Sequence, residues 1–301
     1  GGAFMAEAFG KLTGRPAAVF VSRGPGSSNA AIGIHTAMQD STPMVVFVGH
    51  VNAKSIGRES FQEIDQHAFF GAVAKAVLSP KDTNDIPGVT AEAVRLSTDG
   101  RPGPVVVQIP RDVSSMDTAS AIPAPAARTP HEADAALVDK AVAMIDNAKA
   151  PLVVAGEMIS NQNAADALTK FAAAAGLPVM SAYRRLDVMP NSHDCYAGHL
   201  EINRFENQLE AIDQSDLIIA IGTRLDGITS ADETMFCTEK PLIHVYPEAD
   251  ILARFESDVA LDADMEPALA ALTAKLSPPD TMRSARMTQL HTSFMAFSQP
   301  G

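Results

Sequence analysis

The sequence has few cysteines, no long apolar run and no cluster of basic residues. Two cysteines in 301 residues are too few for a disulfide framework, so a reducing, cytoplasmic location is predicted. No apolar stretch approaches the roughly 18 residues that a membrane-spanning helix needs, so we expect no membrane association. The net charge of −13 argues against a nucleic-acid partner, because nucleic-acid binding depends on clustered Lys and Arg.

Several chemical signatures are also missing. There is no Gly-x-Ser-x-Gly turn, so a hydrolase triad has little support. There is no Gly-Lys-Ser/Thr, and the third glycine of a dinucleotide fingerprint would fall at Asn29. His193, Cys195 and His199 are close in sequence, but their spacing matches no zinc pattern, so we predict no metal site in this chain. His35 and the isolated His67 are interpreted as packed or solvated.

The apolar pattern predicts two α/β domains, each a doubly wound parallel sheet. Continuously apolar strands alternate with helices, which is typical of parallel sheets covered on both faces. A Pro- and Ala-rich connector over 116–131 separates a domain over 1–115 from a second over 132–276. The closing stretch, 277–301, has weak helical character and no evident partner within the chain.

The boundaries of the elements follow from periodicity and from turn residues. Strands are predicted at 17–21, 44–49, 71–78, 105–109, 152–155, around Val179, at 217–221 and at 242–245. Helices are predicted at 1–14, from Ser28 or Asn29 to 39, and at 87–97, 133–147, 164–175 and 266–276. The strand at 17–21 is expected to be buried, and Gly24-Pro25-Gly26 is expected to form a tight loop.

The first candidate site is the segment from Ser22 to Asn29. It leaves the carboxyl end of a strand and opens a helix, the position at which open α/β sheets bind ligands. Its glycines allow a ligand to approach the backbone, and a helix N-terminus offers unpaired N–H groups. From the residues alone, a purely structural strand-to-helix turn is an equally good interpretation.

A family resemblance favours the ligand site. Three segments in order are similar to the thiamine-pyrimidine domain of the acetolactate synthase family of thiamine-diphosphate enzymes: GAFMAEAFGKLTG at 2–14, GPGSSN at 24–29 and DSTPMV at 40–45. The resemblance continues through FQEID at 61–65, RPGPV at 101–105, GTRL at 222–225 and HVYP at 244–247.

The resemblance implies thiamine diphosphate and Mg²⁺ as cofactors of the whole protein and a 2-oxo acid as substrate. The cofactor acts as an ylid that adds to the 2-oxo acid and stabilises the carbanion left by decarboxylation. By position, the residues implied to bind its pyrimidine are Ser22, Gly24, Pro25, Gly26 and Asn29. Phe61 and Gln62 are implied to face the substrate. The alternatives are that Phe61 is an ordinary core residue and that Gln62 is an ordinary surface residue.

The resemblance also implies that parts of the active site lie outside these residues. The family's activating glutamate directly precedes its first helix, so it is expected upstream of Gly1, and no catalytic residue is expected in this chain. The Mg²⁺-binding Gly-Asp-Gly motif belongs to a C-terminal domain in the family and does not occur here. We therefore expect a fragment with the pyrimidine-binding and central domains, inactive alone, from a homodimer or homotetramer.

The cofactor of the second domain stays open. Family members hold FAD, ADP or nothing there, and the positions implied to meet a dinucleotide are Arg101, Gly156, Gly222 and Arg224. For the activity of the whole protein, the resemblance favours an acetolactate synthase-like decarboxylation with possible carboligation. The alternatives are a benzaldehyde lyase-like enzyme, an oxalyl-CoA decarboxylase-like enzyme and a non-catalytic nucleotide-binding or assembly module.

Overall fold

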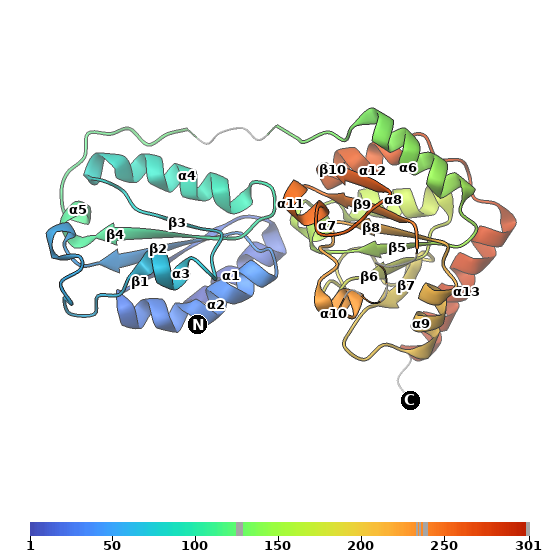
Figure 1. The fold of residues 1–301 in the computed structure, drawn as a ribbon, viewed down its shortest axis with the longest axis horizontal. Helices are drawn as coiled ribbons and strands as arrows, with labels where there is room; N and C mark the ends of the chain where they lie inside the picture. Colours follow the sequence, from blue (N-terminus) through green and yellow to red (C-terminus); the bar gives the residue numbers. More distant parts are fainter. Residues whose placement is uncertain (125–128, 233, 235, 237–239, 299–301) are drawn as a thin grey trace. The chain divides into compact units, whose positions relative to one another are not determined.

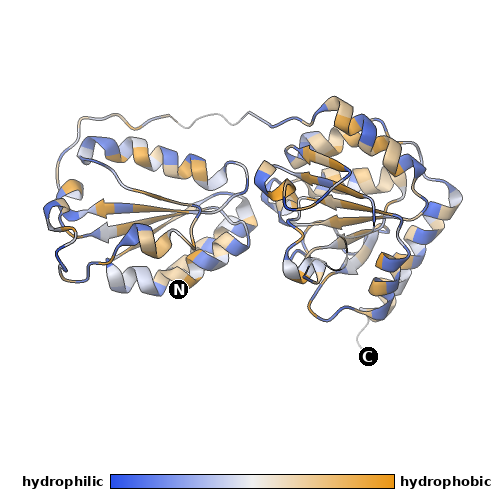
Figure 2. Ribbon diagram, in the orientation of Figure 1, coloured by the Kyte–Doolittle hydropathy of each residue, from blue (hydrophilic) through white to orange (hydrophobic). Residues whose placement is uncertain are grey.

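The computed structural model describes residues 1–124, 129–232, 234, 236 and 240–298. The chain divides into two compact units, Gly1–Arg128 and Thr129–Gly301, here called unit 1 and unit 2 (Figure 1). Each unit is a parallel sheet with helices on both faces, which confirms the predicted fold class. In both sheets the strands are mainly apolar, as Figure 2 shows.

Unit 1 is built on four parallel strands in the order β1-β2-β4-β3. The strands are β1 Ala17–Val21, β2 Met44–His50, β3 Ala76–Leu78 and β4 Pro104–Pro110. The helices are α1 Gly2–Thr13, α2 Gly24–Gln39, α3 Gln66–Phe70, α4 Ile86–Thr98 and α5 Arg111–Ser114, with 3₁₀ turns η1 Ala53–Ser55 and η2 Thr83–Asp85. Val46 and Val48 of β2 pack with α1, α2 and α3, whereas Val45 packs with α4. Each fully buried valine of this kind contributes about 1.5 kcal/mol or more to stability.

The first strand is where the prediction of burial is wrong. β1 has the predicted bounds, but it lies at the edge of the sheet and only Val19 is buried. Phe20 is 75% exposed and stacks on Phe47 with 4.7 Å between ring centroids. An apolar run therefore predicted the strand correctly but did not predict its place in the sheet.

Two predicted boundaries in unit 1 also need correction. α2 begins at Gly24, so Gly24-Pro25-Gly26 is its first turn and not a loop. Proline is tolerated there because the first N–H groups of a helix have no partner within the helix. Ser28 and Asn29 lie inside the helix, where Ser28 Oγ donates to the carbonyl of Gly24 (2.9 Å). The predicted strand at 71–78 shrinks to β3, because residues 71–75 form turns after α3.

Unit 2 is built on six parallel strands in the order β10-β9-β8-β5-β6-β7. The strands are β5 Pro151–Ala155, β6 Val179–Ser181, β7 Tyr196–His199, β8 Leu217–Ile221, β9 Leu242–Tyr246 and β10 Val259–Asp262. The helices are α6 Ala135–Asn147, α7 Glu157–Asn161, α8 Ala165–Ala175, α9 Glu206–Asp213, α10 Gly227–Ser230, α11 Ala249–Leu252, α12 Met265–Thr273 and α13 Thr281–Phe297. The chain builds outward from β5 to β7 and then, from β8 to β10, in the opposite direction. The switch in direction between β5 and β8 creates the crevice at which such sheets commonly bind ligands.

The closing helix α13 packs against the rest of unit 2, which corrects the expectation that 277–301 has no partner within the chain. Arg283, only 6% exposed, donates to the carbonyl oxygens of Ile145 (2.9 Å) and Ala148 (2.6 Å) at the end of α6. Phe294 lies edge-on to Tyr196 with 5.0 Å between ring centroids. A guanidinium suits this place because the last carbonyls of a helix are unpaired and carry partial negative charge.

The same helix also covers a buried thiol. Cys195 Sγ lies 3.4 Å from the Met287 sulfur of α13. Burial, with a smaller contribution from Asp194, raises the pKa of the Cys195 thiol to about 11.

Among the described residues, no helix combines the length and apolarity needed to cross a bilayer.

Candidate functional site

The carboxyl edge of the unit 1 sheet gathers most of the predicted site residues. Because β1, β2 and β4 are parallel, they all end at this edge. Ser22 follows β1 directly, and His50 is the last residue of β2. The segment after β4 is tied to the segment after β2, since the Asp112 carboxylate accepts from the backbone N–H of Ala53 (3.0 Å).

Two hydrogen bonds bring the two predicted groups of site residues together. The backbone N–H of Gly24 donates to the carbonyl of Gln62 (3.0 Å). Arg23 Nη1 donates to the carbonyl of Phe61 (3.0 Å). The segment predicted to bind the cofactor is thus attached to the segment predicted to face the substrate. No role was predicted for Arg23, and in the structure it makes one of these two attachments.

Phe61 and Gln62 are both exposed at this edge. Phe61 is 79% exposed, so the alternative interpretation as a core residue is wrong. Gln62 adopts φ 62°, the left-handed region that costs a non-glycine residue roughly 1–2 kcal/mol. Strained residues of this kind are concentrated at ligand-binding sites, where the surrounding structure maintains them.

The carboxylates that follow hold the Phe61–Gln62 loop in place. Glu63 accepts from the backbone N–H groups of Gly57 (2.5 Å) and Ser60 (2.8 Å), and these bonds lower the pKa of Glu63. Asp65 caps α3 by accepting from the N–H of Ala68 (3.0 Å). Both acids therefore act as braces of the loop.

His50 and Gln66 form a part of the site that sequence reasoning missed. His50 is 3% exposed, and burial is the main cause that lowers its pKa. Its Nδ1 and the Nε2 of Gln66 have no hydrogen-bond partner among the described residues, while Gln66 Oε1 accepts from Ser27 Oγ (3.0 Å). Buried polar atoms without a partner are rare and indicate a ligand or water. The signal in the sequence was a histidine that ends an otherwise apolar strand.

The two predicted pyrimidine-binding residues with polar side chains, Ser22 and Asn29, are accessible. Ser22, Pro25 and Asn29 are exposed, Gly24 is buried and Gly26 is half-buried. A Cβ on Gly26 would lie 2.7 Å from Ser22 Oγ, so the glycine leaves the space that this hydroxyl occupies. A hydroxyl, an amide and a glycine-lined helix start suit a flat ring with nitrogen donors and acceptors, so the residues fit the pyrimidine implied by the resemblance.

The positions implied to meet a dinucleotide are arranged differently. Arg224 Nε donates to Glu157 Oε1 (2.8 Å), and the Tyr246 hydroxyl donates to the same oxygen (3.1 Å). In unit 1, Arg101 Nε donates to Ser41 Oγ (2.9 Å), and its Nη2 donates to the carbonyl of Met38 (2.5 Å). Each arginine is thus engaged inside its own unit, and in unit 2 neighbouring residues fill the space beside Gly156 and Gly222.

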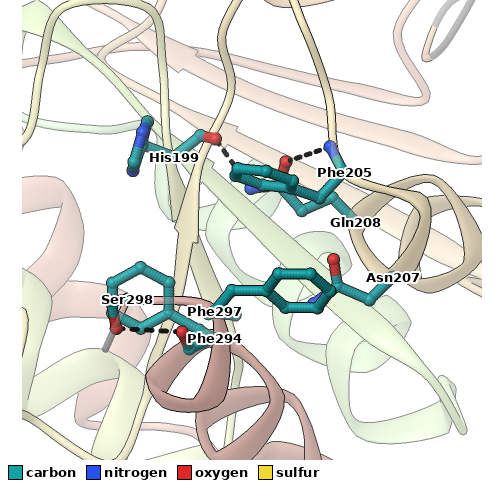
Figure 3. A pocket seen from close by; sticks show the side chains of 8 residues that line it. His199, Phe205, Asn207, Gln208, Phe294, Phe297 and Ser298 are labelled. Atoms are coloured by element: carbon teal, nitrogen blue, oxygen red, sulfur yellow. Dashed lines mark hydrogen bonds between the residues drawn. The ribbon is translucent and has the colours of Figure 1, made fainter. Parts of the chain in front are cut away.

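A separate pocket of about 170 Å³ lies in unit 2 between β7, α9 and α13 (Figure 3). Phe205 and Phe297 stack there with 5.2 Å between ring centroids. Gln208 donates to the carbonyl of His199 (2.7 Å) and accepts from the N–H of Phe205 (3.1 Å). None of the predicted site residues lines this pocket. Its lining comes mainly from side chains at the place where α9 and α13 pack together.

The two histidines that the sequence analysis interpreted as packed or solvated are both on the surface. His35 is exposed beside Gln39 at 3.4 Å, and His67 is exposed beside Ser79 Oγ at 2.9 Å. Within 1–124, 129–232, 234, 236 and 240–298, no three His, Cys, Asp or Glu side chains gather in a way that would hold a metal.

Comparison with known proteins places both units among thiamine enzymes. Residues 1–69 match the family model "Thiamine pyrophosphate enzyme, N-terminal TPP binding domain", and residues 138–272 match "Thiamine pyrophosphate enzyme, central domain". The two models are successive domains of one family, and each match lies within one of the two units.

Several acetolactate synthases are similar to this chain. The large subunit of Corynebacterium glutamicum is 33% identical over 291 residues, which cover 93% of this chain and 46% of that protein. The large subunit of Lactococcus lactis is 30% identical over 90% of this chain and 48% of that protein. The isozyme 1 large subunit of Escherichia coli is 30% identical over 90% of this chain and 49% of that protein. The chain thus spans about half the length of the curated relatives it matches.

Proposed function

Because this chain belongs to the family of thiamine pyrophosphate enzymes, we propose that it supplies the pyrimidine-binding and central domains of an acetolactate synthase-like enzyme, which decarboxylates one 2-oxo acid and joins the remaining fragment to a second 2-oxo acid. The observation that carries the proposal is the attachment of Phe61 and Gln62 to Arg23 and Gly24 at the carboxyl edge of the unit 1 sheet. That attachment puts the proposed substrate-facing residues beside the proposed cofactor-binding turn.

Each site residue predicted from the sequence at this edge has a proposed role. Thiamine diphosphate, when bound with Mg²⁺, supplies the carbon nucleophile that makes loss of CO₂ from a 2-oxo acid feasible. The Ser22 hydroxyl and the Asn29 amide bind its pyrimidine, for which Gly24, Pro25 and Gly26 shape the surface. The Gln62 amide donates to a substrate oxygen, and the exposed Phe61 ring shields the reacting carbon from water.

A second subunit is the proposed partner. α1 turns Ala3, Ala6 and Gly10 toward the core and leaves its large apolar side chains in solvent. These exposed residues are Phe4 (44%), Met5 (71%), Phe9 (44%) and Leu12 (85%). Contiguous exposed apolar side chains mark interaction surfaces, and a homodimer or homotetramer that covers this stripe is proposed. Met5→Glu should lower the association constant in sedimentation, and unchanged association would contradict this use of the stripe.

The test of function is a calorimetric titration of thiamine diphosphate with Mg²⁺ into the complete protein that carries these residues, followed by assays with 2-oxo acids. The informative variant is Gln62→Gly. Glycine adopts the φ of 62° without strain, so the variant should fold with unchanged or higher stability while turnover of a 2-oxo acid falls about 100-fold, the scale expected when one substrate-positioning contact is lost. Gln214→Ala, at an exposed glutamine of unit 2, is the matched control and should leave turnover unchanged.

Each outcome decides between candidate functions. Binding with turnover of pyruvate supports the acetolactate synthase-like activity. Binding with turnover only of aromatic aldehydes or of oxalyl-CoA would replace it with one of the two related activities. If the complete protein does not bind thiamine diphosphate, the proposed function is wrong and the non-catalytic module is favoured. The cytoplasmic location stays a prediction.

A further inference from the structure

The crevice between β5 and β8 is the place in unit 2 where a dinucleotide would be expected. The two strands are paired in parallel up to Ala155 and Ile221, and the order of the sheet reverses between them (Figure 1). In open parallel sheets, the segments that leave such strands usually diverge and admit a ligand. The segments here are Gly156–Glu157 after β5 and Gly222–Arg224 after β8.

In this protein the backbone closes the crevice. The N–H of Gly156 donates to the carbonyl of Ile221 (2.9 Å), and the N–H of Met158 donates to the carbonyl of Gly222 (2.9 Å). The pairing of the strands therefore continues beyond their ends and into the first turn of α7. Those N–H groups are the ones that would otherwise face a phosphate.

The two glycines are explained by packing inside the protein. A Cβ on Gly156 would lie 2.5 Å from Cβ of Thr223. A Cβ on Gly222 would lie 3.0 Å from both Met158 Cβ and Met265 Sδ. The space that each glycine leaves is thus filled by the chain itself, and neither position needs a ligand to account for it.

The charges at the crevice are also matched internally. The side chains of Glu157 and Arg224 are only 6% and 14% exposed, and 2.8 Å separates Glu157 Oε1 from Arg224 Nε. Burial acts to lower the pKa of Arg224, but the Glu157 carboxylate and the nearby Tyr246 and Asp226 outweigh it and raise the pKa. Glu157 is thus the buried counter-anion of Arg224.

We propose that the Glu157 carboxylate occupies the anion position of the β5–β8 crevice in place of a nucleotide phosphate, so that unit 2 binds neither FAD nor ADP. The proposal does not depend on the function of unit 1, because it concerns residues of unit 2 alone.

The test needs no turnover and uses the purified 301-residue chain, with absorbance scans for flavin and melting temperatures measured with FAD, ADP or pyrophosphate. Wild-type protein should purify without flavin and show no shift in Tm with any of the three. In Glu157→Gln, which keeps the shape of the side chain and removes its charge, Arg224 has lost its counter-anion. Pyrophosphate should then raise Tm, which requires binding at least about tenfold tighter than the weakest binding that the wild-type measurement would detect, the scale of one hydrogen bond to a charged group.

Two controls define the outcome. Glu157→Gln combined with Arg224→Gln should lose the response to pyrophosphate, because the response requires the guanidinium. Asp139→Asn removes an exposed acid that pairs with Lys275 in the same unit and should show no response. Wild-type protein that carries flavin, or whose Tm rises with FAD or ADP, would overturn the proposal, even if Glu157→Gln does not fold. A folded Glu157→Gln that ignores pyrophosphate would overturn it as well.

Discussion

The carboxyl edges of the two sheets are built from the same kinds of element, but their polar side chains differ in exposure and in hydrogen bonding. At the edge of unit 1, Ser22 and Asn29 face solvent, and the buried Nδ1 of His50 has no partner among the described residues. At the edge of unit 2, the charged side chains of Glu157 and Arg224 are largely buried and bind each other, while the buried Nδ1 of His244 also has no partner among the described residues. The fold alone therefore does not identify a ligand site. A more specific sign is the exposure of the polar side chains, since Ser22 and Asn29 of unit 1 face solvent and the charged pair of unit 2 is largely buried.

The largest expected effect concerns the internal pair of unit 2. Glu157→Ala should lower the free energy of unfolding of unit 2 by about 3–5 kcal/mol, because it leaves a buried guanidinium without its counter-anion. Urea denaturation followed by tyrosine fluorescence measures this unit selectively, since the chain has no tryptophan and its three tyrosines all lie in unit 2. The control Asp139→Ala, at an exposed pair, should cost less than about 1 kcal/mol. Equal losses in the two variants would remove the contrast between the edges.

The next effect tests whether the crevice of unit 2 is filled. Gly222→Ala should lower the free energy of unfolding by about 2–3 kcal/mol, because Gly222 has φ 62° and its Cβ would lie 3.0 Å from two methionine side chains. Gly57→Ala in unit 1 is the matched control. Gly57 has φ 78° but no atom within 4 Å of the added carbon, so only the backbone strain, about 1 kcal/mol, is expected. Urea midpoints measure both, and a Gly222→Ala variant as stable as Gly57→Ala would mean an open crevice.

A smaller effect concerns the pH dependence that His50 gives to unit 1. The folded pKa of His50 lies below its ordinary value of 6.5, chiefly because of burial; Glu63 and Asp65 oppose this lowering, and Arg23 and His67 add to it. As the pH falls below 6.5, the unfolded chain takes up a proton that the folded chain does not, so stability is lost until the folded pKa is reached. If the folded pKa lies one pH unit below the unfolded pKa, the loss amounts to about 1.4 kcal/mol.

His50→Gln should therefore flatten the dependence of unfolding free energy on pH between about 7 and 5. Circular dichroism during urea titration at several pH values measures this slope. His35→Gln, an exposed histidine of α2, is the control and should leave the slope as it is. A slope that His50→Gln does not change would show that this histidine is not buried in solution.

The smallest effect on stability belongs to the exposed residues of unit 1. Ser22→Ala and Asn29→Ala should each change the free energy of unfolding by less than about 0.5 kcal/mol, because neither side chain is buried. Both variants should nevertheless weaken binding of thiamine diphosphate by the complete protein, as calorimetry would report. A large loss of stability would favour the alternative of a purely structural turn.

The sequence predicted the interior of both sheets well, because continuous apolar runs identify central parallel strands. The strand at 217–221 agrees with β8 residue for residue. β10 was missed because its four residues alternate between buried and half-buried positions at the edge of the sheet. The partner of α13 was missed because Arg283 binds carbonyls more than 130 residues away, and a sequence pattern treats an arginine as exposed.

The candidate site was predictable only where its chemistry is local. The segments around Gly24 and Phe61 were each identified by motif, but the two hydrogen bonds that join them, from Arg23 and from the Gly24 N–H, connect residues 38 positions apart. The Glu157–Arg224 pair spans 67 residues and follows from the order of strands in the sheet. Long-range pairing of charges is decided by topology, which the residue pattern does not specify.

The buried Cys195 allows the detachment of α13 from the rest of unit 2 to be measured. Its thiol has a pKa of about 11 and touches Met287 of α13, so a thiol reagent reaches it only after the helix lifts from the sheet. In a Cys237→Ser background, the rate of labelling at neutral pH would equal the frequency of that opening when reagent is in excess. The native thiol of Cys195 therefore reports how often α13 detaches from the sheet, without a cysteine having to be introduced.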